Sequence, residues 1–214
     1  MKENCVIVGA GTYGQVYAAY LKEKYNIIGF IDDNKALHHI HVDDIKVLGD
    51  FDFLLSNIER STNVFIPVGN NHIRVNLLQR VIGAGFKTPN FVHKDTQIHS
   101  SVKLGKCVYI LPGTHIMPFT EIKDFVLVSM GVNIAHHTII EQGCFFSQGV
   151  NIGASIHLKE NAYCGIASTV MTGVKEIGKN SLIGAGAVII RDVPDGATVV
   201  GNPGRIIKQV DVSE

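Results

Sequence analysis

The chain has 214 residues, enough for two small domains or one large one, and 46% of them are hydrophobic. Lysine plus arginine and aspartate plus glutamate both number 19, so the sequence offers neither a basic field for nucleic acid nor an acidic tail. No secretory leader or membrane-spanning apolar run is recognisable, and the four cysteines form no CxxC pair. These features predict a cytoplasmic protein with reduced, buried thiols.

The first 92 residues have the pattern of a small Rossmann-like α/β domain. Strand, helix, strand, strand, helix and strand are predicted in this order at residues 4–8, 15–24, 26–31, 63–68, 72–82 and 86–92. The last of these strands leads directly into a different pattern. We therefore predict a domain over residues 1–92 and a second over residues 93–214.

A glycine-rich turn joins the first strand to the first helix. The segment Gly9-Ala10-Gly11-Thr12-Tyr13-Gly14 has the spacing GxGxxG, which lets backbone amides approach a diphosphate at the positive end of a helix. Asp32 and Asp33 end the next strand, where an acid can hold a ribose hydroxyl or simply cap a turn. Three alternatives follow: a dinucleotide such as NAD, a nucleotide diphosphate, or a structural turn. The domain is too short for both halves of a dinucleotide-binding fold.

From about residue 98 to residue 193 the chain repeats every six residues. A large apolar residue, here called an anchor, stands at Ile98, Leu104, Ile110, Ile116, Ile122, Val128, Ile134, Ile140, Phe146, Ile152, Leu158, Cys164 and Val170 and, after one inserted residue, at Ile177, Ile183 and Ile189. Small residues recur four places after an anchor, at Thr114, Thr120, Thr138, Ala162, Ser168 and Ala187.

This period fits neither a helix nor an ordinary strand. A helix repeats its apolar face every 3.6 residues and a half-buried strand every two. One buried residue in six is the signature of a parallel β-helix, in which three hexads make a coil of about 18 residues. Successive coils stack by parallel strand pairing about 4.8 Å apart, and roughly five coils fit the repeat region.

Several motifs in a fixed order resemble a known family. They are the GxGxxG turn, the acid pair after the second strand, and the three segments Gly69-Asn70-Asn71-x-x-Arg74, Asn90-Phe91-Val92-His93 and Val200-Gly201-Asn202-Pro203-Gly204-Arg205. Together with the hexads they resemble bacterial nucleotide-sugar acetyltransferases of the bacillosamine N-acetyltransferase and sialic acid O-acetyltransferase type. The resemblance implies a left-handed β-helix, a homotrimer, and acetyl-CoA as co-substrate in the groove between neighbouring helices.

Acetyl transfer needs a base, and histidine is suited to this near neutral pH. His136 and His137 follow the anchor Ile134 on the turn of a hexad, where side chains point away from the packed interior. The stretch 133–137 resembles the family segment that carries the catalytic histidine, which falls on His136. The alternative is a solvent-facing turn histidine. His137 stands where many members have a carboxylate, so an acidic partner has to come from Asp124, Glu141 or another subunit.

Three other histidines on repeat edges match no family element. His99, His115 and His157 lie on repeat edges, and the loop at 38–41 contains three more histidines. Because that loop has no cysteine or acid at a recognisable ligand spacing, we interpret it as a surface loop and predict no metal site.

The coenzyme groove is predicted from the stacking of coils. Gly153 and Ala154 lie one coil beyond His136, where small side chains leave room for a pantetheine arm. The resemblance adds Ile166 and Ala185 as coenzyme contacts. Tight β-helix turns favour glycine and alanine anyway, which is the alternative explanation. Phe145 stands where some members have a second histidine.

The resemblance also implies the substrate. It places the nucleotide of a sugar donor against Gly11, Thr12, Tyr13, Asp32, Asp33 and Gly69. The predicted activity is direct acetyl-CoA-dependent N-acetylation of a nucleotide-diphosphate-linked sugar, with a 4-amino-4,6-dideoxy sugar favoured, in bacterial surface glycan (lipopolysaccharide O-antigen) synthesis. Two alternatives stay open: O-acetylation of sialic acid or another hydroxyl sugar, and a non-catalytic trimeric scaffold or nucleotide sensor.

Overall fold

The computed structural model describes residues 2–211. The chain forms two compact units, with the division between Pro89 and Asn90. No helix within the described range is long and apolar enough to cross a membrane.

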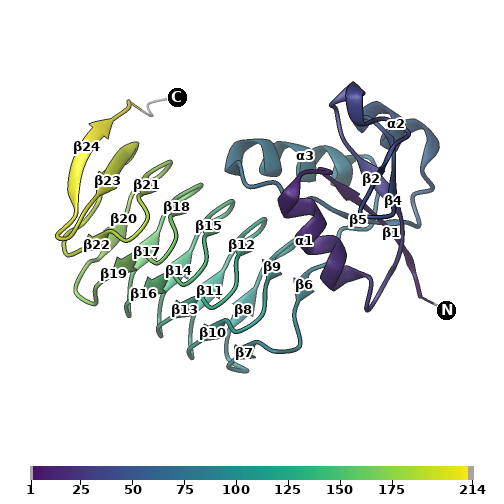
Figure 1. Ribbon diagram of the computed structural model, residues 1–214. Coiled ribbons are helices and arrows are strands. Elements are labelled where there is room, and N and C mark those ends of the chain that lie inside the picture. The colour runs from purple at the N-terminus through teal and green to yellow at the C-terminus, as the bar shows by residue number, and fades with distance from the viewer. Residues whose placement is uncertain (1, 212–214) are drawn as a thin grey trace. The chain divides into compact units, whose positions relative to one another are not determined.

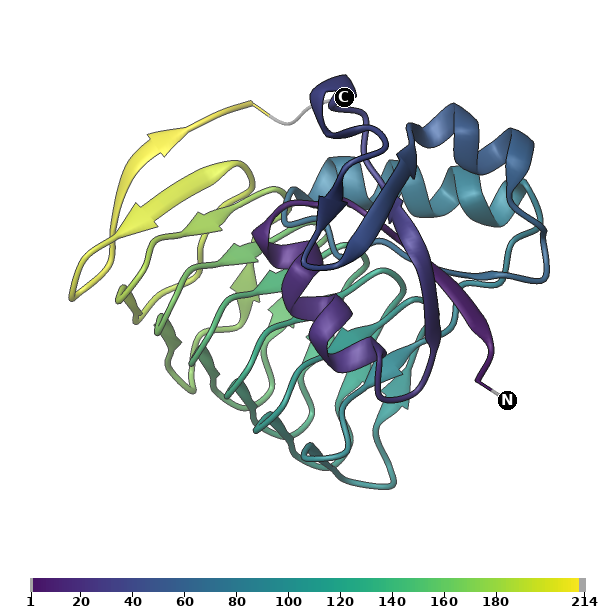
Figure 2. The ribbon, with the colours of Figure 1, turned by 45° about the vertical axis from the view of Figure 1, so that its right-hand side comes forward.

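The N-terminal unit is a five-stranded sheet in the order β3-β4-β2-β1-β5. Its elements are β1 (Asn4–Val8), α1 (Thr12–Leu21), β2 (Asn26–Ile31), the short helix η1 (Lys35–Leu37), β3 (His41–Val42), β4 (Ile45–Gly49), α2 (Phe51–Asn57), β5 (Asn63–Phe65) and α3 (Asn71–Gly83). Strands β4, β2, β1 and β5 run parallel, and β3 is antiparallel to β4. Helix α1 lies on one face of the sheet, and α2 and α3 lie on the other (Figures 1 and 2).

Three details of this unit differ from the prediction. The hairpin β3–β4 and helix α2 were not predicted. Asp43 and Asp44 form the two-residue turn of this hairpin, with positive φ angles of 48° and 62°. The predicted third strand ends early, at Phe65. The strand predicted at residues 86–92 does not form as one element. Lys87 makes an isolated bridge to Asn63, whereas Phe91–Val92 (β6) pairs with a strand of the C-terminal unit. The C-terminal unit therefore begins ahead of His93.

The C-terminal unit is a β-helix, seen in Figure 1 as a stack of short arrows from β6 to β24. Its strands are β6 (Phe91–Val92), β7 (Gln97–Ile98), β8 (Lys103–Leu104), β9 (Tyr109–Ile110), β10 (His115–Ile116), β11 (Glu121–Ile122), β12 (Leu127–Val128), β13 (Asn133–Ile134), β14 (Ile139–Ile140), β15 (Phe145–Phe146), β16 (Asn151–Ile152), β17 (His157–Leu158), β18 (Tyr163–Cys164), β19 (Thr169–Val170), β20 (Glu176–Ile177), β21 (Leu182–Ile183), β22 (Val188–Ile189), β23 (Ala197–Val200) and β24 (Arg205–Gln209).

Three sheets form the walls of this β-helix. The order β22-β19-β16-β13-β10-β7 makes one wall, here called the groove sheet, and β20-β17-β14-β11-β8 makes the second. The third runs β24-β23-β21-β18-β15-β12-β9-β6. Before the inserted residue, strand partners within each sheet are 18 residues apart, as in His115–Asn133–Asn151. The predicted combination of a Rossmann-like unit and a β-helix of hexapeptide repeats is confirmed.

The predicted anchors form the core of the β-helix. They are buried along its length, and only Ile98 and Leu104 near its start are partly exposed. The small residues four places after an anchor are also fully buried. Thr114, Thr120 and Thr138 show why small hydroxyl residues suit this position, because each Oγ1 donates to a carbonyl oxygen 15 residues further along, in the next coil.

The inserted residue and the C-terminus interrupt this regularity. Strand pairs that span the inserted residue are 19 residues apart, as in His157–Glu176, Tyr163–Leu182 and Thr169–Val188. The extra residue lies in the turn before Glu176, where Gly173 has a φ of 104° and Thr172 bridges Val174. After β23 the chain reverses, and β24 pairs with β23 antiparallel. The hexads do not predict this reversal.

Candidate functional site

His136 and His137 lie on a turn between β13 and β14, and both side chains are exposed. We call the edge of the β-helix formed by residues 117–120, 135–138, 153–156 and 171–175 the His136 corner. The two histidines meet at this corner, with 3.0 Å between their Nδ1 atoms. Their rings are perpendicular, with centroids 5.1 Å apart. The side chain bonded to His136 is thus the neighbouring histidine.

Adjacent coils hold the backbone of this pair on both sides. The amide of Ser155 donates to the carbonyl of His136 at 3.0 Å, and the amide of His137 donates to the carbonyl of Pro118 at 3.2 Å. The ring of Phe119 packs against the ring of His137, with centroids 4.8 Å apart. The turn is therefore a fixed support for the two imidazoles.

The two acids considered as partners of His136 are engaged elsewhere. Asp124 lies on another turn, between β11 and β12, where its Oδ1 accepts from the amide of Lys106 at 2.8 Å. The Oε1 of Glu141 lies 3.0 Å from the Nε2 of His157. Neither carboxylate bonds His136 in this chain, and the ring that its Nδ1 meets is that of His137.

A groove of about 400 Å³ runs over the groove sheet and reaches the His136 corner. It is lined by His115, Met117, Asn133, Ile134, Ala135, Asn151, Ile152, Gly153, Thr169, Val170, Met171 and Thr172. Its floor includes a ladder of polar side chains: Asn133 Nδ2 donates to Asn151 Oδ1 at 2.9 Å, and His115 Nδ1 lies 3.3 Å from Asn133 Oδ1. Sequence reasoning missed this ladder, although an outward polar residue directly before an anchor, recurring every 18 residues, could have indicated it.

Gly153 and Ala154 lie on the His136 corner, one coil beyond the histidines. A Cβ at Gly153 would collide with the backbone amide nitrogen of Thr172. The amide of Ala154 donates to Thr172 Oγ1 at 3.2 Å. The stacking of coils by itself therefore requires glycine at position 153. No comparable collision explains the small side chain of Ala154.

Ile166 and Ala185 lie on a different edge, formed by residues 129–132, 147–150, 165–168 and 184–187, which we call the Ile166 corner. The side chain of Ile166 is 53% exposed and Ala185 is exposed as well. They lie in adjacent coils, since the amide of Gly186 donates to the carbonyl of Ile166 at 2.8 Å. The predicted coenzyme residues thus form two groups, on the two corners that border the groove sheet. Phe145 lies on neither corner and packs edge-on against Tyr163.

In the N-terminal unit, three loops follow the carboxyl ends of the adjacent parallel strands β2, β1 and β5. They begin at Asp32, Gly9 and Ile66, so the predicted substrate residues all lie at the carboxyl end of the parallel strands. Gly11 and Thr12 are exposed at the start of α1, which has no side-chain cap. Amides at such a helix end can bind an anion.

The acid pair has structural contacts at this edge. Asp32 accepts from the amides of Ala10 and Asn34 at 2.8 and 2.9 Å, and Asp33 Oδ1 accepts from the amide of Phe51 at 3.0 Å. Both carboxylates thus cap backbone amides, and the bond from Ala10 to Asp32 joins the glycine turn to the end of β2. Asp33 is exposed, whereas Asp32 is half-buried.

The loop after β5 is fixed by its own side chains. Asn70 caps α3 by accepting from the amide of Ile73 at 3.1 Å. The buried Arg74 donates to the carbonyl of Val68 at 2.8 Å and to Asn71 Oδ1 at 3.0 Å. Gly69 therefore lies in a loop that these bonds hold at the sheet edge. Tyr13 is half-buried on α1, with its ring centroid 5.4 Å from that of Tyr17.

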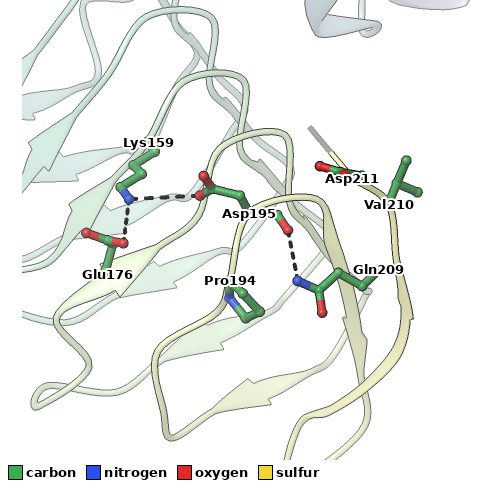
Figure 3. A pocket seen from close by; sticks show the side chains of 7 residues that line it. All are labelled: Lys159, Glu176, Pro194, Asp195, Gln209, Val210 and Asp211. Atoms are coloured by element: carbon green, nitrogen blue, oxygen red, sulfur yellow. Dashed lines mark hydrogen bonds and ion pairs between the residues drawn. The ribbon is translucent and has the colours of Figure 1, made fainter. Parts of the chain in front are cut away.

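A second hollow, of about 720 Å³, lies beside the C-terminal strand (Figure 3). Three of its charged side chains pair with one another: Lys159 Nζ lies 2.6 Å from Glu176 and 3.9 Å from Asp195. None of the predicted site residues lines it. Among residues 2–211 no group of three or more histidine, cysteine or acidic side chains could hold a metal ion.

Several known proteins resemble this chain. Residues 4–81 match the family model of the PglD N-terminal domain. The chain is 28% identical to the GDP-perosamine N-acetyltransferase of Escherichia coli O157:H7, with 97% of both chains covered. It superposes with a TM-score of 0.88 on the crystal structure of PerB from Caulobacter crescentus in complex with CoA and GDP-perosamine, at 26% identity over 97% of this chain and 98% of that one. The chain therefore resembles these N-acetyltransferases over both of its units, and its residues 4–81 match the PglD N-terminal domain.

Other acetyltransferases match only part of this chain. The chain is 35% identical over 107 residues to a serine acetyltransferase of Synechococcus elongatus, covering 46% of this chain and 44% of that enzyme. The first curated relatives are thus matched over less than two thirds of their length. The likeness to PerB, in contrast, includes both units, as the order of motifs in the sequence predicted.

Proposed function

We propose that this protein is an acetyl-CoA-dependent N-acetyltransferase for the amino group of a nucleotide-diphosphate-linked sugar. The observation that carries the proposal is the exposed histidine pair beside the groove, in a chain that matches PerB with CoA and GDP-perosamine over nearly its whole length. By the same likeness, a 4-amino-4,6-dideoxy sugar is the favoured substrate class, and bacterial surface glycan synthesis is the favoured setting.

In the proposed reaction His136 is the general base. The sugar amine attacks the carbonyl carbon of the acetyl thioester, and its proton passes to the free imidazole nitrogen of His136. The carbon–sulfur bond then breaks, the acetyl group stays on the sugar nitrogen, and the departing CoA thiolate takes the proton back from His136. The transfer is direct, and it needs no nucleophile from the protein.

The cysteines support a direct transfer. All four are buried thiols that form no disulfide. Burial raises the pKa of Cys5 and of Cys164 to about 12, so almost none of either thiol is in the thiolate form that attacks a thioester. The proposal includes a cytoplasmic location, where thiols stay unpaired.

Buried thiols lead to the first prediction. Treating the folded protein with N-ethylmaleimide should leave acetyl transfer within about twofold of the untreated rate, because a buried, protonated thiol reacts slowly. Mass spectrometry of the treated protein checks that no adduct has formed, and unfolding in denaturant before treatment should give four adducts, one for each cysteine. Rapid inactivation together with a single adduct on the native protein would contradict a direct transfer.

We propose a homotrimer in which the coenzyme lies between two β-helices. The predicted coenzyme residues lie on two separate corners, so one subunit's His136 corner can face a neighbour's Ile166 corner across the bound acetyl-CoA. Exposed apolar side chains on both corners support such packing, with Met117, Phe119 and Met171 on one and Met130 and Ile166 on the other.

The second prediction tests the Ile166 corner. Replacing Ala185 with tryptophan should raise KM for acetyl-CoA by about tenfold or more and leave KM for the nucleotide sugar within about twofold, because the new ring fills the pantetheine path. Initial-rate kinetics with each substrate varied in turn measure both constants. Lys179→Trp is the matched control for adding a tryptophan. Lys179 lies on the turn between β20 and β21, which does not border the groove sheet, so this variant should change neither constant. Equal effects of the two variants would argue against this placement.

The nucleotide is proposed to bind at the carboxyl edge of the N-terminal sheet. Gly11, Thr12 and Tyr13 offer the start of α1 to the diphosphate, and Asp33 and Gly69 lie on the loops beside it. Asp32 contributes by holding the glycine turn through the amide of Ala10.

One assay tests the proposal as a whole. CoA release is measured with UDP-, dTDP- and GDP-linked 4-amino sugars and, in parallel, with the matching 4-hydroxy sugars and free sialic acid. We expect release with one or more of the amino sugars only. Release with the hydroxy sugars would establish the O-acetyltransferase instead, and a protein that binds neither acetyl-CoA nor any of the sugars would be a scaffold.

A further inference from the structure

We propose that His137 is a positioning residue that sets the tautomer of His136 and so takes the place of a carboxylate. This inference rests on the proposed function, because the tautomer matters only if His136 acts as the base. The two Nδ1 atoms lie 3.0 Å apart. At this distance the pair shares one hydrogen, since neither two bare lone pairs nor two N–H groups form a hydrogen bond.

Only one direction of this bond is compatible with catalysis. If His137 donated, the proton of His136 would be on Nε2, and that nitrogen could not accept another. If His136 donates from Nδ1, its Nε2 has a free lone pair and can take the proton of the sugar amine. His136 then has hydrogen on both nitrogens, and the bond to His137 persists through the transfer. The proton transfer itself therefore requires His137 to be the acceptor.

The ring of His137 is held in place for this task. Its backbone has a φ of 58°, and its amide is bonded to the carbonyl of Pro118. The ring of Phe119 is tilted by 42° against it. Phe119 is anchored in turn, because its amide donates to Ser101 Oγ at 2.9 Å. The contacts thus extend over two further coils and keep the acceptor beside His136.

No carboxylate among the described residues competes with His137 for this bond. The corner segments stacked on either side, 117–120 and 153–156, contain no titratable side chain. Titratable groups on the neighbouring strands are bonded elsewhere: His115 to Asn133, Glu121 to Lys103 and Lys123, and Glu141 to His157.

The backbone conformation guides the choice of variants. Because His137 has a positive φ, an alanine there would add strain, whereas glycine removes the ring without it. Asparagine also tolerates this conformation, and its Oδ1 can accept the bond. Aspartate does the same and adds the negative charge that His137 lacks.

We expect His137→Gly to lower kcat by about 10–100-fold with KM for acetyl-CoA nearly unchanged, the range found when the hydrogen-bond partner that orients a metal-ligating histidine is removed. His137→Asn should recover kcat to within about threefold of wild type. His137→Asp should move the acidic limb of the kcat/KM profile upward by about one pH unit, because a carboxylate stabilises protonated His136 and the base form then appears at higher pH. Wild-type kcat in His137→Gly, or an unmoved limb in His137→Asp, overturns the proposal.

A second readout does not depend on activity. Nitrogen-15 NMR of the histidine rings in the free protein reports which nitrogen of His136 carries the hydrogen, and His136→Asn assigns its signals. We expect hydrogen on Nδ1 in the wild type and in His137→Asn, and a mixture of both tautomers in His137→Gly. Hydrogen on Nε2 in the wild type overturns the inference. A protein that has the expected tautomer but acetylates no amino sugar shows instead that the proposed function has failed.

Discussion

Replacing His136 with alanine should lower kcat for acetyl transfer by about 10²–10⁴-fold, the usual contribution of a general base. The physical reason is that no other histidine or carboxylate on the same turn can take over, because His137 is bonded through Nδ1 and held by Phe119. CoA release at saturating substrates measures kcat. Thermal unfolding should be unchanged within about 1 °C, since the side chain of His136 is exposed.

A matched histidine on the same edge of the β-helix is the control for this variant. His99 is exposed and begins the turn two coils before that of His136, where it bonds Ser101. His99→Ala removes the same atoms at an equivalent corner and should retain kcat within about twofold. Full activity in His136→Ala would show that the base lies elsewhere, and equal losses in both variants would point to a general effect on the corner.

Replacing Gly14 with alanine should destabilise the N-terminal unit by about 1–3 kcal/mol and raise KM for the nucleotide sugar. A Cβ at this position would collide with the carbonyl oxygen of Gly9, so the turn that opens α1 has to shift. The contact is with backbone, which cannot move aside as the tip of a flexible side chain can. Thermal unfolding measures the loss of stability, and initial rates measure KM.

Gly83→Ala is the control in the same unit. Gly83 ends helix α3, and an added Cβ there meets no atom within 4 Å. Alanine favours a helix over glycine, so this variant should keep or slightly raise the unfolding temperature and leave KM unchanged. If both glycine variants behaved alike, the collision at Gly14 would not be the cause.

The β-helix could be predicted in detail because its information is local. Each hexad contributes one large buried anchor, and before the insertion the strand partner of a residue lies 18 positions along the chain. An unbroken series of anchors from Ile98 to Val170 therefore predicts strands, core and stacking together. The same reasoning located the inserted residue before Ile177, which shifts the partner of Thr169 to Val188.

Three features outside the hexapeptide repeat were not predicted correctly from the sequence. The β3–β4 hairpin turns through Asp43 and Asp44, which adopt positive φ without the glycine that usually marks such a turn. The reversal into β24 occurs beyond the last hexad, where no period remains to guide a prediction. The strand predicted at residues 86–92 was divided between two units, because apolar content alone does not say which sheet a segment joins.

The sequence by itself determined the period, the buried anchors, the glycine turn and a histidine on a turn facing outward. Only the tertiary structure decided that Gly153 is required by Thr172, and that His136 bonds His137 instead of Asp124 or Glu141. The physical reason is distance. A repeat specifies which residues point inward, but which outward side chains come within 3 Å of each other depends on how far each coil turns before it meets the next.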